Sequence, residues 1–312
     1  MPRSMNNSSP QTQSEHQRVS IIVPISNMAG KLANLTKWLI VSEYENFESL
    51  LICNNCTDKT FDELQLMKSK NGLLKTRIIL TDEKGPGAAR NLGLDEASGD
   101  YVVFWDADDV GHVEVLSRIS REVSLGTNLI ISNYKLVSHD EFEIRKILTG
   151  NDSSKLFQVG MNPGVWRMVF DRKFILGCKF GTSTMGEDQV FLGEVLARGP
   201  KIVFDEQFLY SYYKGIPGQL TGSNKNIDAA EASASCISRL LTVSSTSNKE
   251  TLGVMTIRLV ITLIIRGSLR AKFRASRLMK NVIINQRSSA QENSLPALRL
   301  IFRVVKETVI EK

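Results

Sequence analysis

The chain has 312 residues, of which 42% are hydrophobic and 23% are charged, so it can bury a full hydrophobic core and is not a fibrous or fully disordered protein. The net charge of +6 is unevenly placed, because the residues from Ser245 onward hold 13 Lys and Arg against 4 Asp and Glu; that segment carries +9 and the remainder −3. No run approaches 18 apolar residues, so we expect no membrane-spanning helix.

The 4 cysteines, with no secretory signal at the N-terminus, favour a reducing, cytoplasmic compartment. Cys53 and Cys56 form a C-x-x-C pair. A zinc site would need a second such pair or nearby histidines, and the only histidines are His16, His112 and His139, so we do not expect zinc. A thioredoxin-like redox pair stays open as an alternative.

Strands and helices alternate through the first third of the chain. Residues 1–18 are rich in Ser, Asn and Gln and predict a disordered leader. After them, β-branched and apolar runs predict buried strands, and apolar residues three and four apart predict amphipathic helices between the strands. We expect strands at 19–24, 49–53, 77–80 and 101–105, and helices at 32–39, from 61 onward, at 88–97 and at 113–123. This alternation predicts an α/β fold with a mixed, mostly parallel sheet flanked by helices.

Three carboxylates, Asp106, Asp108 and Asp109, follow the strand at 101–105 within one turn. Open α/β sheets bind ligands at the carboxyl ends of strands, and carboxylates this close repel one another unless a cation lies among them. A divalent cation held against a diphosphate would relieve that repulsion. The alternative is an acidic turn in which Asp109 caps the next helix.

Further strands are expected at 129–137, 201–204 and 208–213. Residues 152–164 show little periodicity and lead to Trp166, which is either a platform for a sugar ring or a core side chain. Residues 215–223 are rich in glycine and form either a segment that closes over a bound ligand or a plain linker.

The last part of the chain, residues 226–312, is helical and basic. Between residues 260 and 282 the apolar side chains share one side and the arginines the opposite side: Val260, Ile264, Ala271, Ala275, Leu278 and Val282 against Arg266, Arg270, Arg274 and Arg277. A shorter second example combines Leu298, Ile301 and Val305 with Arg299, Arg303 and Lys306. Such helices suit the surface of an anionic membrane; alternatively, they pack on the rest of the chain and leave a solvated basic face. We expect no nucleic acid as a partner, because the rest of the chain is slightly acidic and has no stacking-aromatic motif.

Several segments together resemble one known family. They are V-S-I-I-V-P at 19–24, I-C-N-N-C-T-D-K-T at 52–60, G-P-G-A-A-R-N-L-G-L-D-E-A-S-G-D-Y-V-V-F-W-D-A-D-D at 85–109 and M-G-E-D-Q-V-F at 185–191. The order is similar to that of the family 2 glycosyltransferases, which have the Rossmann-like GT-A fold. The resemblance covers roughly residues 19–223. It implies a GT-A domain at 19–225, between the leader at 1–18 and the helical extension at 226–312.

The resemblance also implies the reaction: an inverting, metal-dependent transfer of a hexose from a nucleotide sugar, expected to be a UDP-sugar, to a hydroxyl of a glycan or lipid-linked acceptor in surface polysaccharide or glycolipid synthesis. In this reading Asp188 is the catalytic base and Glu187 its supporting neighbour; the alternative is an acidic pair favoured by a helix N-terminus. In the D-A-D motif, Asp108 would bind Mn²⁺ or Mg²⁺ directly, and Asp106 would face the ribose or the outer shell of the metal.

The donor site implied by the resemblance contains Pro24, Ser26 and Asn54 near the base. Lys84 and Arg90 are the candidates for the diphosphate, although Lys84 could equally lie in solvent and Arg90 could pair with an acidic side chain. The enzyme would be cytoplasmic, with peripheral contact at the inner face of the cell membrane.

Some positions depart from the family pattern. Cys53 and Asn54 stand where aspartates are usual, Ser26 stands where a tyrosine often stacks on the base, and Lys59 replaces a common glycine. These departures leave a second hypothesis open, a non-catalytic sugar-nucleotide-binding or scaffold protein of the same fold. A nucleotidyltransferase is disfavoured, because residues 26–30 do not supply its lysine-bearing glycine-rich loop.

Overall fold

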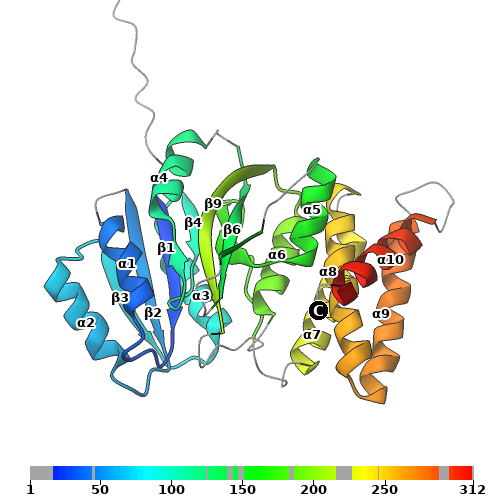
Figure 1. Ribbon diagram of the computed structural model, residues 1–312, viewed down its shortest axis with the longest axis horizontal. Helices are drawn as coiled ribbons and strands as arrows, with labels where there is room; N and C mark the ends of the chain where they lie inside the picture. The colour runs from blue at the N-terminus through cyan, green and yellow to red at the C-terminus, as the bar shows by residue number, and fades with distance from the viewer. Residues whose placement is uncertain are drawn as a thin grey trace, which may run out of the picture.

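The computed structural model describes residues 17–43, 46–123, 126–138, 143–146, 151–182, 186–215, 227–244, 246–287 and 295–310. Figure 1 shows a central sheet with helices on both sides and a group of helices at one end of the long axis. The predicted leader at 1–18 lies outside the described residues except for its last two. Of these, Arg18 donates its N–H to Asp100 Oδ2 at 3.0 Å, so the chain is already fixed one residue before the first strand.

The first half of the sheet is parallel, and its strands are buried except for the edge strand, in which Leu80 is 58% exposed. Its strands are β1 (Val19–Ile25), β2 (Phe47–Asn54), β3 (Thr76–Thr81) and β4 (Tyr101–Phe104), in the order β3-β2-β1-β4. The connecting helices are α1 (Ala33–Ser42), α2 (Thr60–Asn71) and α3 (Pro86–Glu96). All residues of β2 are buried, which explains the continuous apolar run Leu50–Cys53 in the middle of this strand. The strands and helices predicted here are confirmed.

The second half of the sheet mixes strand directions. It contains β5 (Val110–Gly111), β6 (Leu129–Ser138), β7 (Glu143–Lys146), β8 (Met168–Asp171) and β9 (Ile202–Lys214), with α4 (Val113–Glu122) between β5 and β6. The order continues from β4 as β8-β6-β9-β5, and β7 pairs with β6. Strand β8 is antiparallel to both β4 and β6, whereas β6 and β9 are parallel. The predicted mixed α/β sheet is confirmed.

Two segments in this half differ from their appearance in the sequence. Residues 152–164, in which the sequence shows little periodicity, contain helix α5 (Asp152–Met161), and the Asn151 side chain caps this helix by accepting the Ser154 N–H at 3.0 Å. Its polar first turn and closely spaced apolar residues hid the helical period. The runs at 201–204 and 208–213 are one strand, β9. Its register against β6 shifts between Asp205 and Phe208, so the polar residues between the runs form an irregularity of the strand rather than a turn.

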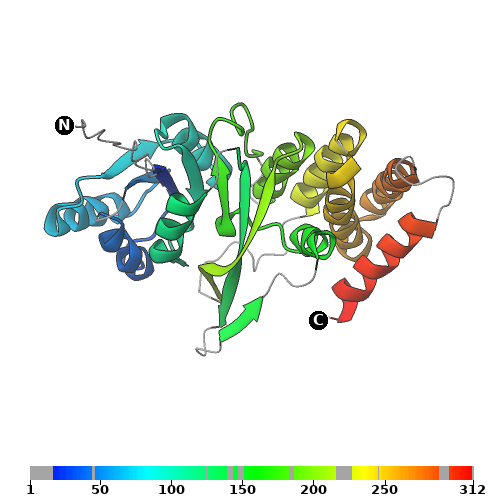
Figure 2. The same ribbon diagram turned by 90° about the horizontal axis from the view of Figure 1, so that it is seen from above.

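The helices that follow are α6 (Glu187–Ala197), α7 (Ile227–Val243), α8 (Thr246–Arg266), α9 (Leu269–Arg287) and α10 (Leu295–Ile310). Figure 2, seen from above, shows these last helices side by side beyond the sheet. One core runs from the sheet into them, because Phe170 of β8, Leu192 of α6 and Leu252 of α8 belong to the same buried cluster.

The amphipathic stripe predicted between residues 260 and 282 spans a helix break. Helix α8 ends at Arg266 and α9 begins at Leu269. The backbone at Gly267 turns so tightly that a Cβ there would lie 2.3 Å from the Leu263 carbonyl oxygen, and only glycine fits. Ser268 Oγ then caps α9 by accepting the Ala271 N–H.

The apolar side of that stripe packs inward, with Val260, Ala271, Ala275 and Val282 buried, whereas Ile264 is 45% exposed. Among the residues of α10 whose side chains are described, Leu300 and Val304 are buried, whereas the predicted Val305 is 38% exposed; the predicted Leu298 lies outside this set. The alternative in which these helices pack on the protein therefore describes the stripe. Among the described residues, no helix is long and apolar enough to cross a membrane.

Candidate active site

The centre of the site is Arg90 of α3. Its side chain bridges the acidic turn after β4 and the first turn of α6. Its Nη2 donates to Asp106 Oδ1 at 2.7 Å, and its Nη1 donates to Glu187 Oε1 at 2.6 Å. The side chains of Arg90 and Glu187 are buried, whereas that of Asp106 is 28% exposed. Burial alone would lower the pKa of Arg90, but the charges of Asp106, Glu187 and Asp188 raise it above its ordinary value. Arg90 is therefore a fixed cation between the two acidic motifs.

Close packing at Gly87 supports this arrangement. A Cβ on Gly87 would lie 2.3 Å from the carbonyl oxygen of Gly181 and 3.2 Å from Cγ of Glu187. Only a residue without a side chain lets the first turn of α3 approach the segment before α6 this closely. The absence of a side chain at Gly87 thus lets α3 lie close enough to α6 for Arg90 to reach Glu187.

Asp188 follows Glu187 in the first turn of α6 and is only partly buried. Its Oδ1 accepts the N–H of Gln189 at 2.8 Å. Burial and, secondly, the charge of Glu187 raise the pKa of Asp188 to about 7, while Arg90, the Gln189 amide and Arg258 act in the opposite direction. A carboxylate with a pKa near neutrality can accept a proton from a hydroxyl and return it to solvent, as a general base must. Because Glu187 is held by Arg90, the geometry leaves Asp188 as the carboxylate available for this role.

The third carboxylate of the acidic turn points into the protein. Asp109 is buried; its Oδ2 accepts the Tyr210 hydroxyl at 2.8 Å and its Oδ1 accepts the Tyr213 N–H at 2.7 Å. Burial and the nearby Asp108 and Asp106 raise the pKa of Asp109 well above its ordinary value. The idea that Asp109 caps the next helix is wrong, since α4 follows His112 and has no side-chain cap. Asp109 instead fastens the turn to β9.

Asp106 and Asp108 both keep partial exposure beside that turn. The described residues contain no group of three or more His, Cys, Asp or Glu side chains that could hold a metal ion by themselves. Two carboxylates nevertheless fit a divalent cation that takes one or two protein ligands and completes its shell with phosphate oxygens and water. Asp108 and Asp106 are the residues that would hold such an ion.

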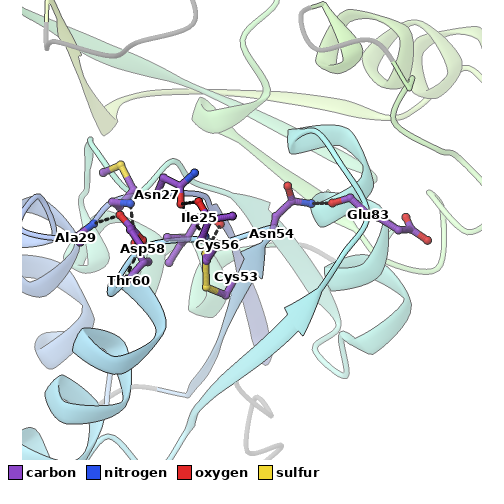
Figure 3. Close-up of a disulfide and its surroundings, with 11 residues drawn as sticks. Ile25, Asn27, Ala29, Cys53, Asn54, Cys56, Asp58, Thr60 and Glu83 are labelled. Atoms are coloured by element: carbon purple, nitrogen blue, oxygen red, sulfur yellow. Dashed lines mark hydrogen bonds between the residues drawn. A yellow bond between two sulfur atoms is a disulfide. The ribbon is translucent and has the colours of Figure 1, made fainter.

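Figure 3 shows the ends of β1 and β2, where the base of a nucleotide was predicted to bind. Asn54 is buried and donates its side-chain N–H to the carbonyl oxygen of Glu83, which fixes its orientation. Ser26 is exposed and Pro24 partly buried at the end of β1, and Lys84 is exposed in the loop before α3. These residues surround one sheet edge, and their contacts with a donor remain predictions.

Cys53 and Cys56 form a disulfide in this region (Figure 3). The cysteine content favoured a reducing compartment, and the alternative of a C-x-x-C redox pair agrees with this disulfide; Cys178 and Cys236 are free. The physical reason for the disulfide is local: Asn55 adopts a left-handed conformation with φ of 47°, and the turn brings the two cysteine Cα atoms to 5.9 Å.

Hydrogen bonds tie the loop after β1 to the loop after β2. Asn27 Oδ1 accepts the Thr57 N–H at 2.9 Å, and Asp58 Oδ2 accepts the Ala29 N–H at 3.2 Å. Asp58 also accepts the N–H of Thr60 in the first turn of α2 at 3.0 Å (Figure 3). The two loops therefore form one unit along the predicted base site.

Trp166 lies in a one-turn helix, η1 (Val165–Arg167), and takes part in an aromatic cluster. Its ring stacks on Tyr210 at 4.9 Å and on Tyr212 at 5.6 Å between centroids, and meets Tyr134 edge-on at 4.5 Å. Through Tyr210, whose hydroxyl accepts the Asp106 N–H at 3.0 Å, this cluster contacts the acidic turn. Trp166 is partly exposed, and its role as an acceptor platform remains a prediction.

Arg258 of α8 belongs to the site and was not predicted. Its Nη2 donates to Gln189 Oε1 at 2.7 Å and its Nη1 to the carbonyl oxygen of Met161 at 3.0 Å. Burial lowers the pKa of Arg258, and the charge of Asp188 partly offsets that effect. The signal in the sequence was a lone arginine within the apolar run at 252–265, where a cation is costly unless it has a partner.

Comparisons with known proteins match the chain in sequence. The profile of the family described as glycosyl transferase family 2 matches residues 20–179. An uncharacterised glycosyltransferase of Haemophilus influenzae is 31% identical over 124 residues, which are 40% of this chain and 46% of that protein. The succinoglycan biosynthesis protein ExoO of Rhizobium meliloti is 27% identical over 157 residues, covering 45% of each protein. The chain thus spans less than half the length of these relatives.

Solved structures match it in fold. Residues 1–349 of S. aureus TarS in complex with UDP align with a TM-score of 0.66 at 16% identity, covering 87% of this chain and 81% of that one. The mannosyltransferase PcManGT of Pyrobaculum calidifontis, in complex with GDP-Man and Mn²⁺, aligns with a TM-score of 0.57 at 16% identity, covering 94% and 81%. These similarities confirm the predicted fold class, including its C-terminal helices.

Proposed function

Because the chain belongs to glycosyl transferase family 2, we propose that it transfers a sugar from a nucleoside-diphosphate sugar to a hydroxyl group of an acceptor. The observation that carries this proposal is the Arg90 bridge. It joins Asp106, on the side where a donor diphosphate would bind, to Glu187, the neighbour of a carboxylate with a pKa of about 7. A donor bound beside Asp106 and an acceptor hydroxyl bound beside Asp188 would therefore lie next to each other, as the reaction requires.

The proposed reaction is a single displacement. The acceptor oxygen bonds to the anomeric carbon as its proton passes to Asp188, and the bond between that carbon and the diphosphate oxygen breaks. Attack opposite the leaving group inverts the anomeric configuration. Asp188 must be ionised to accept the proton, and Arg90 keeps Glu187 from competing for that position.

A bound Mn²⁺ or Mg²⁺ would stabilise the negative charge that develops on the leaving diphosphate. Asp108 and Asp106 would hold the ion. Asn54, with its side chain fixed at the end of β2, would contact the base. The structures of TarS with UDP and with UDP-GlcNAc support a UDP-hexose as the donor. The name of ExoO supports polysaccharide synthesis, with a glycan or a lipid-linked glycan as the acceptor.

The test is thermal stabilisation against nucleoside diphosphates and nucleotide sugars, with and without Mn²⁺. At 100 times Kd, a ligand that binds only the folded state adds about 2.7 kcal/mol, which for a chain of this length is about 4 °C. We expect one nucleotide class to give this shift with metal, and Asp108→Ala to lose it. No stabilisation by any nucleotide would contradict the proposal.

The departures at Ser26 and Cys53 keep a second candidate, the non-catalytic sugar-nucleotide-binding or scaffold protein. It predicts nucleotide stabilisation without nucleotide release from the stabilising nucleotide sugar. Release that requires Asp188 would exclude this candidate, whereas equal background rates in the wild type and Asp188→Asn would support it.

A further inference from the structure

The turn between α8 and α9 exposes large apolar side chains. Ile265 at the end of α8 is 56% exposed, and Leu269 and Phe273 in the first turns of α9 are 86% and 64% exposed. Large exposed apolar side chains that lie close together and are rimmed by polar residues are typical of protein or membrane interaction sites. We propose that this tip, residues 264–273, docks the protein on an anionic lipid bilayer.

The charge around the tip supports that partner. From Thr251 to Gln291 the sequence contains no Asp or Glu, but it contains eight Lys and Arg. Arg266, Arg270 and Lys272 are exposed among the apolar residues of the tip. Cations beside apolar side chains match the two layers of a bilayer surface, with anionic headgroups outside and acyl chains beneath.

Packing on the opposite side of α9 makes this face available. Ala271 and Ala275 are buried against the neighbouring helices. Arg274 of α9 forms an ion pair with Glu231 of α7, which ties the N-terminal part of α9 to α7. Apart from Ile264, which is 45% exposed, the stripe predicted from the sequence packs inward, and the solvent-facing apolar residues Ile265, Leu269 and Phe273 lie outside that stripe.

The tip lies on the same side of the molecule as the candidate active site. Ser233 of α7 donates to the carbonyl oxygen of Gly186, the residue before Glu187, at 3.2 Å. Two residues earlier on α7, Glu231 holds Arg274 of α9. Figure 1 shows the α8–α9 turn at the lower edge, toward which β1 runs from the top. A tip docked on a bilayer would bring the site toward the membrane surface, which, resting on the proposed function, points to a membrane-embedded, lipid-linked acceptor.

Other occupants agree less well with this surface. Nucleic acid would pair with the cations but leave Leu269 and Phe273 against water and phosphate. A second copy of the chain would bring two acid-free tips together, and like charges repel. An anionic bilayer satisfies the apolar and the cationic groups at once.

The experiment measures partitioning of the full chain onto vesicles of phosphatidylcholine alone or mixed with phosphatidylglycerol. We expect binding to the anionic vesicles that weakens as salt rises. Replacing Arg266, Arg270 and Lys272 by Gln should reduce partitioning by about 5-fold per cation, the equivalent of about 1 kcal/mol each, so on the order of 100-fold together. Leu269→Glu combined with Phe273→Glu should reduce it by at least about 10-fold.

The matched control is Leu74→Glu, because Leu74 is 89% exposed in the loop before β3, far from the tip. This variant should bind vesicles as the wild type does. Wild-type protein that does not bind anionic vesicles, tip variants that bind them normally, or equal competition by duplex DNA would overturn the proposal. Nucleotide stabilisation, measured on the same variants, reports separately on the proposed function and should not change.

Discussion

Replacing Asp188 by Asn tests the proposed base most directly. At pH 8 the wild-type carboxylate is ionised, because this pH is above its raised pKa of about 7. Asn keeps the size but cannot accept a proton, so the rate should fall by about 10²- to 10⁴-fold, the usual contribution of general base catalysis. In the wild type, the rate should rise with pH and level off above about pH 7, because only the ionised form is active.

The same substitution should stabilise the protein, and the sign follows from linkage. The pKa of Asp188 rises from 3.8 in the unfolded chain to about 7 in the folded protein, so the folded state binds the proton more tightly. The contribution of Asp188 to stability is therefore fully present below about pH 4 and is lost as the pH rises through 7. At about 1.4 kcal/mol per pKa unit the full loss is about 4 kcal/mol. Partial exposure screens the charge, and we expect about 2 kcal/mol.

The Asp188→Asn variant has no carboxylate to ionise and keeps those roughly 2 kcal/mol of stability at pH 8, so its melting temperature should be about 3 °C higher than that of the wild type. Less than half of this gain should remain at pH 5. The assays are nucleotide release from pH 5.5 to 9 and thermal melts at pH 5 and 8. Asp62→Asn is the control, because Asp62 also lies in the first turn of a helix but is exposed. A variant that keeps more than a tenth of the activity, or a flat wild-type pH profile, would refute the reasoning.

Arg90→Met leaves two carboxylates without their cation, so the free energy of unfolding should fall by about 3–5 kcal/mol in urea titrations; Arg77→Met, which breaks an exposed ion pair, should cost less than about 1 kcal/mol. Arg258→Gln removes a charge that lowers the pKa of Asp188, so the pH–rate profile should move to higher pH while nucleotide stabilisation stays unchanged. Gly87→Ala should destabilise the fold by about 1–3 kcal/mol, because its Cβ would lie 2.3 Å from a backbone oxygen; thermal melts would detect this.

The first half of the fold could be predicted because local pattern determines it. Strand β2 is buried on both faces, so its apolar run at Leu50–Cys53 is continuous and is bounded by the polar residues Ser49 and Asn54. The break at Asp205 to Phe208 was different, because a strand irregularity and a true turn have the same polar composition. Pattern alone does not separate these two cases; only pairing with β6 does.

The residues of the site could be named from the sequence, but their partners could not. Arg90 was predicted to bind phosphate or to pair with an acid, and the structure shows pairing with two acids, one of them 97 residues away. For Asp109 the alternative was that it caps a helix, yet its partner Tyr210 lies 101 residues further along the chain. Periodicity and spacing report on neighbours within a few turns, so contacts over such distances require the fold.

Arg258 shows that the helical extension belongs to the site as well as to the core. The predicted boundary between residues 225 and 226 separates two regions by composition, and that division remains a prediction. Across it, Arg258 of α8 contacts Gln189 beside the proposed base, and Ser233 of α7 contacts Gly186 before it. Any movement of the helices would therefore shift the start of α6, where Glu187 and Asp188 are held. If the α8–α9 tip docks on a bilayer, the same helices link the membrane to the geometry of the base.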